Sequence, residues 1–154
     1  MQLDTIDVLA CNATDLELAR ALFYAIKDAT VVAVHGDEVL FSKEHGVKPL
    51  LKWIAEGKDL AGWAVADKVV GKAPALLYSV LGPASVFAPV MTRSARAVLL
   101  ANEIACGYDQ LVNKIENRAG NGQCPMDSTV INVFDPYEAV GLIRDRVATM
   151  AAVA

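Results

Sequence analysis

Apolar segments with helical spacing alternate with β-rich apolar segments along most of this chain, and this alternation limits the possible folds more than any other feature. A helix is predicted first, over residues 15–27, because Thr14 and Glu17 match a capping box. A hairpin should follow, since two β-rich segments flank the turn-forming pair Gly36-Asp37. The two strands of this hairpin are expected at 30–35 and 38–42. Further strands are predicted at 60–66, 85–90 and 110–115. Further helices are predicted at 48–56 and 68–81, from Thr92 or Ser94 to 105, from 125, and at 136–150.

Several of these boundaries depend on single residues. Asp67 is expected to cap the helix that follows it, and Pro74 should kink that helix because proline cannot donate a helical hydrogen bond. Thr92 or Ser94 is expected to cap the next helix, which Gly107 should close.

The order of elements determines the predicted architecture. Strands joined through helices run parallel, and such sheets are covered on both faces. The sequence therefore predicts an α/β fold, a three-layer α/β/α arrangement around a mixed sheet of about five strands. Without a repeat or linker, the chain is expected to form one domain over residues 1–154, with its core at about 14–150.

Composition excludes several functional classes. The formal net charge is −4 and the basic residues are not clustered, which disfavours nucleic-acid binding. No apolar run approaches the roughly 20 residues of a membrane span, and the N-terminus does not match a signal peptide. The three cysteines are odd in number and unpatterned, which favours a cytoplasmic location. The 55% hydrophobic content favours a homo-oligomer.

Three strand-to-helix junctions should meet at one edge of the sheet, where ligands of open α/β sheets bind. Helix N-termini and basic side chains at these junctions would suit a small polar or anionic ligand. The candidate ligand-binding residues are Lys68, Lys72, Thr92, Arg93, Ser94, Asn117 and Arg118. In the alternative interpretation, Asp67 and Thr92 are only helix caps and the cations are ordinary surface residues.

A thiol and two carboxylates are the candidate catalytic residues: Cys124, Asp127 and Asp67. Because Pro125 can open a helix, Cys124 should occupy the N-cap, where the helix dipole favours a thiolate. Asp127 would compete for the same N–H groups, and no histidine lies close in sequence to act as a base. A capping or merely buried thiol is the alternative.

No metal or cofactor is predicted. A catalytic zinc site needs about three Cys, His or carboxylate ligands, and the chain has no C-x-x-C, H-E-x-x-H or H-x-E motif. The segment Gly120-Asn121-Gly122 is too short for a dinucleotide fingerprint and is not followed by a P-loop lysine.

Five segments of the chain resemble an uncharacterised bacterial family with a cytidine deaminase-like fold. The matching segments are residues 35–41, 46–51, 66–73, Asn117-Arg118 and 124–127. Zinc deaminases carry His-x-Glu or Cys-x-Glu at one helix start and Pro-Cys-x-x-Cys at the next. The corresponding junctions here read Asp67-Lys68-Val69 and Met91-Thr92-Arg93-Ser94, so zinc-dependent deamination is not expected.

Three hypotheses follow. The first is a zinc-free deaminase-fold domain that binds a small polar or anionic, nucleotide-like ligand. The second is a thiol enzyme for redox chemistry or sulfur transfer through Cys124. The third is a non-catalytic interaction protein that forms a homo-oligomer.

Overall fold

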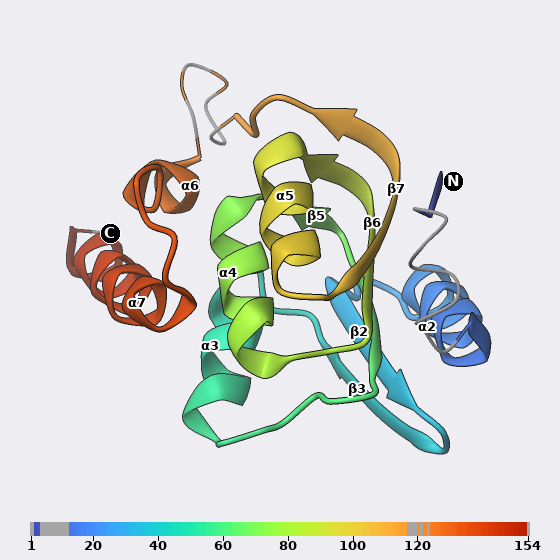
Figure 1. The fold of residues 1–154 in the computed structure, drawn as a ribbon. Coiled ribbons are helices and arrows are strands. Elements are labelled where there is room, and N and C mark those ends of the chain that lie inside the picture. The colour runs from blue at the N-terminus through green and yellow to red at the C-terminus, as the bar shows by residue number, and fades with distance from the viewer. Residues whose placement is uncertain (1, 4–12, 117–119, 121, 123, 154) are drawn as a thin grey trace.

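A computed structural model describes residues 2–3, 13–116, 120, 122 and 124–153 of the chain. Its centre is a mixed sheet of seven strands with helices packed around it (Figure 1). The strands are β1 (Gln2–Leu3), β2 (Val31–His35), β3 (Glu38–Ser42), β4 (Ala64–Asp67), β5 (Val69–Val70), β6 (Ser85–Thr92) and β7 (Ala105–Val112).

The strand order is β1-β7-β6-β4-β2-β3, and β5 also pairs with β6. Strands β4, β5, β6 and β7 are joined by parallel pairings, whereas β2 is antiparallel to both β3 and β4. The predicted α/β class and mixed sheet are therefore confirmed. The expected strand count of about five omitted β1 and β5, which have only two residues each.

Helices lie on both faces of the sheet. They are α2 (Ala13–Ala25), α3 (Lys48–Ala55), α4 (Lys72–Leu81), α5 (Arg93–Ala101), α6 (Pro125–Thr129) and α7 (Pro136–Val153). Figure 1 shows α2 alone on one side of the sheet and the other helices on the opposite side. None of the described helices is both long and apolar enough to cross a bilayer.

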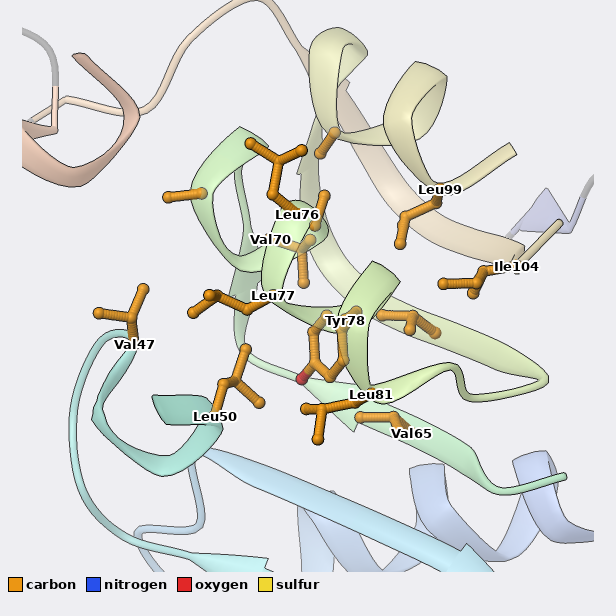
Figure 2. Close-up of a cluster of buried hydrophobic side chains, with 14 of the residues drawn as sticks. Val47, Leu50, Val65, Val70, Leu76, Leu77, Tyr78, Leu81, Leu99 and Ile104 are labelled. Carbon is orange, nitrogen blue, oxygen red and sulfur yellow. The ribbon is translucent and has the colours of Figure 1, made fainter. Parts of the chain in front are cut away.

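Two clusters of buried side chains hold these layers together. The smaller one joins Leu16, Ala19 and Phe23 of α2 to the sheet. The larger one fills the opposite face, with α4 at its centre, and Figure 2 shows Leu77 and Tyr78 of that helix among its members. Helix α4 is buried along most of its length, so residues at its N-terminus are held in fixed positions.

The predicted start of the helix after Asp67 is wrong. Asp67 is the last residue of β4, and α4 begins only at Lys72 with Gly71 as its N-cap. Pro74 therefore lies in the first turn, where no helical N–H donor is required, and the predicted kink has no cause.

Three other predicted boundaries are corrected. Helix α5 ends at Ala101, and Glu103 adopts the positive φ of 60° at which the chain turns after the helix. Gly107 therefore does not close the helix and lies inside β7. The strand expected at 110–115 accordingly begins earlier, at Ala105. Helix α2 begins at Ala13, which places Thr14 inside the helix and not at its N-cap.

Candidate functional site

A cavity of about 200 Å³ lies at the carboxyl end of β4, beside the first residues of α4 and α6. It brings together four of the predicted site residues, which come from segments far apart in the sequence: Asp67, Lys68, Cys124 and Asp127. The other lining residues are Thr30, His45, Gly46, Val47, Val69, Gly71, Pro74, Ile115 and Met126. The wall is thus mostly apolar with a few polar groups, which is the usual composition of a small-molecule site.

Asp67 is the polar group at the end of β4. The Tyr78 hydroxyl, buried in the core, donates a hydrogen bond of 2.5 Å to Oδ2 of Asp67. Burial raises the pKa of Asp67 from 3.8 to about 6, although hydrogen bonds from Tyr78 and from the backbone of Lys68 and Val69 lower it in part. This carboxyl group can therefore exchange a proton near neutral pH, which is a common property of functional carboxylates.

Asp127 caps α4 from a distant segment. Its carboxylate accepts hydrogen bonds from the backbone N–H groups of Lys72 (3.2 Å) and Ala73 (3.0 Å), the latter 54 residues away in sequence. The side chain is only 3% exposed, and burial raises its pKa although these two bonds and the Lys72 charge lower it. The expected competition between Asp127 and Cys124 for the amides of α6 is therefore wrong, because the carboxylate points to another helix.

Lys72 does not line the cavity. Its Nζ atom donates a hydrogen bond of 3.0 Å to the carbonyl of Ile131 and lies 4.6 Å from the ring centroid of Phe134. Burial lowers the pKa of Lys72, and the nearby Asp127 carboxylate partly offsets this effect. Lys72 and Asp127 together fasten α6 and the segment after it to the start of α4.

The second predicted junction lies apart from the cavity. Thr92 caps α5 as expected, since its Oγ1 accepts a hydrogen bond of 3.0 Å from the N–H of Ala95. Arg93 donates from Nε to Oδ1 of Asn113, and the Ser94 hydroxyl lies 3.2 Å from that of Thr92. None of the three is among the lining residues of the cavity. Asn117 and Arg118 lie outside the described residues.

Cys124 occupies the N-cap of α6 as predicted, is half-buried, and its side chain makes no capping hydrogen bond. His45 lines the same cavity, although the sequence offered no reason to place the two together. The Thr30 hydroxyl helps to position His45, because it shares its hydrogen between the carbonyls of Ser42 (3.0 Å) and Glu44 (2.6 Å). The segment after β3 is thereby held against the start of β2.

Metal ligands do not gather in the part of the chain that the structure describes: no three His, Cys, Asp or Glu side chains there lie close enough to share an ion.

Comparison with known proteins places the chain in a family. Residues 21–147 match the model of a family described as TM1506, a domain of unknown function (DUF1893). The chain is also similar to the crystal structure of a DUF1893 family protein (TM1506) from Thermotoga maritima, with 26% sequence identity and a TM-score of 0.79. That similarity covers 86% of this chain and 90% of the other. No curated protein matches the chain. Because the family match spans most of its length, the chain belongs to the DUF1893 family.

Proposed function

We propose that the cavity at the end of β4 binds a small polar ligand about the size of a single ring. The observation that carries this proposal is the position of Asp67. Its carboxyl group lines the cavity and accepts a hydrogen bond from the buried Tyr78 hydroxyl. A dry cavity of about 150 Å³ is known to admit benzene, so about 200 Å³ leaves room for one ring with polar substituents.

Asp67 supplies the chemistry for recognising such a ring. As a carboxylate it accepts a hydrogen bond from a ligand N–H or O–H group, and below its pKa of about 6 it can donate one instead. A ligand that lacks the matching group would leave the largely buried carboxyl with only its hydrogen bonds from Tyr78 and the backbone, which is a source of specificity. The apolar walls at Val47, Pro74 and Met126 would contact the faces of the ring.

A second hollow, of about 830 Å³, supports a ligand with an anionic part. It shares Thr30, His45, Lys68 and Val69 with the cavity, so the two lie side by side. Its walls include three lysines and one carboxylate, which makes this region positive although the whole chain carries −4. The charged residues are Lys27, Lys43, Lys68 and Asp28. A nucleotide-like ligand, with its ring beside Asp67 and its phosphate near Lys68, suits this arrangement.

The sheet supports a cytidine deaminase-like fold as part of the proposal. An antiparallel hairpin at one edge is followed by strands β4, β6 and β7 in parallel, joined by helices. The cavity lies at the carboxyl end of β4, where such sheets bind ligands. The junctions after β4 and β6 carry Asp67-Lys68-Val69 and Thr92-Arg93-Ser94 in place of zinc ligands, so we propose ligand binding without hydrolytic deamination.

A thermal-shift screen against pyrimidines, nucleosides, nucleotides, phosphate and small carboxylates tests the proposal. A ligand at 100 times its Kd adds about 2.7 kcal/mol to folded-state stability, a rise in melting temperature of roughly 5–10 °C for a chain of this size. Asp67→Asn and Lys68→Ala should reduce this rise, whereas the exposed Lys58→Ala and Arg93→Ala should not. A flat screen, or a rise that survives Asp67→Asn and Lys68→Ala together, would refute the site.

A thiol-dependent enzyme is the second candidate function, and one observation favours it: Cys124 and His45 line the same cavity. A histidine beside a cysteine can act as the base that thiol chemistry requires. If His45 activates the thiol, His45→Ala should slow iodoacetamide labelling of Cys124 at pH 7 by about tenfold or more. The matched control is His35→Ala, which alters a histidine outside the cavity wall. Equal labelling rates in all three proteins would exclude this function.

A further inference from the structure

The outer edge of β3 points to a partner for this chain. Strand β3 ends the sheet order, and no strand among the described residues pairs with its outer side. Such an edge presents unpaired N–H and C=O groups that can accept another strand. We propose that the partner is a second copy of this chain, with the two β3 strands paired antiparallel about Leu40.

Exposed apolar side chains on β3 fit this proposal. Val39 is 41% exposed and Phe41 is 51% exposed, although both belong to a regular strand. In the hairpin register they lie opposite Val34 and Val32, whose side chains are buried under α2. Val39 and Phe41 therefore extend the apolar face of the sheet beyond the part that α2 covers. A second copy would bury them.

The sequence around Leu40 is complementary to itself in an antiparallel pair. Pairing about that residue sets Val39 opposite Phe41 of the other copy, an apolar pair of the kind that stabilises neighbouring strands. Asp37 and Lys43 flank β3 at its two ends, so the same register would bring the carboxylate of Asp37 near the ammonium group of Lys43, twice per dimer. Each pair joins two odd-numbered or two even-numbered residues, as the alternating hydrogen bonds of an antiparallel ladder require.

The geometry of the pair keeps like faces together. A two-fold axis through the midpoint of the two Leu40 residues, perpendicular to the sheet, leaves both α2 helices on one side. Val39 and Phe41 of both copies would then form one apolar patch on that side. The two Leu40 side chains would meet on the opposite face, beside a hollow of about 410 Å³ that is also lined by Leu60 and Trp63.

Sedimentation velocity of the full chain over a concentration series tests the proposal through a charge swap. The wild type should dimerise. Asp37→Lys alone should raise the dimer Kd by tenfold or more, because lysines would then face one another, and Lys43→Asp alone should do the same through facing carboxylates. The double variant D37K/K43D should restore the wild-type Kd within about threefold, since both pairs are again of opposite charge.

A second pair of variants tests whether the dimer depends on β3 or on exposed apolar side chains in general. Phe41→Ser should weaken the dimer tenfold or more, whereas Phe134→Ser, at a side chain 80% exposed on another surface, should leave it unchanged. Circular dichroism of every variant checks that the fold is kept. A wild type that stays monomeric at 1 mM would overturn the proposal. So would a dimer insensitive to Phe41→Ser, or a double variant as weak as the single ones.

Discussion

The Asp127 carboxylate lies against the bare α-carbon of Gly71, so closely that a Cβ atom at that position would overlap it. The backbone of Gly71 is extended (φ −96°, ψ −171°), so another residue could adopt its conformation. The glycine is therefore required for space and not for backbone freedom. Without that space Asp127 could not reach the amides that it caps, and α6 would lose one of its attachments to α4.

Gly71→Ala should consequently destabilise the protein. The added methyl group would displace a buried carboxylate from two backbone N–H groups, and bonds to charged groups contribute about 1.5–3 kcal/mol each. We expect the free energy of unfolding to fall by roughly 2–4 kcal/mol, since partial relaxation recovers some of the loss. Urea titration at pH 7 measures this change.

The matched control is Gly141→Ala in α7. Nothing lies within 4 Å of a Cβ atom at that position, and alanine is favoured over glycine in a helix by up to about 1 kcal/mol. The same chemical change should thus stabilise the protein at Gly141 and destabilise it at Gly71. Similar effects at both positions would contradict the assigned role of Gly71.

Asp67 should make stability fall with rising pH. Between pH 3.8 and about 6, the folded state holds a proton on Asp67 that the unfolded chain has released. The stability that this proton supplies is complete below pH 3.8 and is lost as the pH rises through 6. Asp67→Asn cannot titrate, so its stability relative to the wild type should increase by roughly 2–3 kcal/mol from pH 4 to pH 7.

Urea titrations of both proteins at pH 4, 5, 6 and 7 measure this difference. Asparagine can still accept the Tyr78 hydrogen bond through its side-chain oxygen, so the comparison isolates the proton. If the difference in stability between the two proteins stays constant across this pH range, burial does not raise the pKa of Asp67.

Local sequence signals predicted the hairpin and most elements correctly. Gly36-Asp37 marked the turn between β2 and β3, where Gly36 adopts φ 60°, and Pro125 marked the start of α6. These signals work because a turn or a cap depends on the few residues that form it. The antiparallel order of β2 and β3 followed from this turn, and the parallel order of β4 and β6 followed from the helix predicted between them.

The start of α4 could not be predicted in this way. Lys68, Val69 and Val70 fit a helical pattern, and Asp67 resembles an ordinary N-cap. In the structure Val69 and Val70 instead pair with β6, and the cap of α4 comes from Asp127, 54 residues from Ala73. No local pattern encodes a cap from so distant a segment. Only Gly71, which leaves space for the Asp127 carboxylate, is a sequence feature that this cap requires.

The candidate site was predicted in part. Asp67, Lys68, Cys124 and Asp127 do line one cavity, because strand ends and helix starts meet at one edge of the sheet. His45 was missed, since it belongs to neither a strand end nor a helix start, and the Thr30 hydroxyl brings it there through a contact with Glu44.

Thr92 should contribute to the stability of the fold and not to ligand binding. Its hydroxyl is buried and caps α5, so Thr92→Ala should lower the free energy of unfolding by about 1–2 kcal/mol. The neighbouring Ser94→Ala removes an exposed hydroxyl and should change stability by less than about 0.5 kcal/mol. Urea titration measures both, and a loss of ligand-induced thermal shift in Thr92→Ala would contradict the placement of the site.

Protection of Cys124 from iodoacetamide tests the central claim most directly, because this thiol lines the cavity and reports on its occupancy. Labelling is followed by peptide mass spectrometry for the wild type and Asp67→Asn, with each compound of the screen at 10 mM. We predict that at least one ring compound slows labelling of Cys124 tenfold or more in the wild type and has little effect in Asp67→Asn. Unchanged labelling with every compound, or equal protection in both proteins, would contradict a binding site built around Asp67.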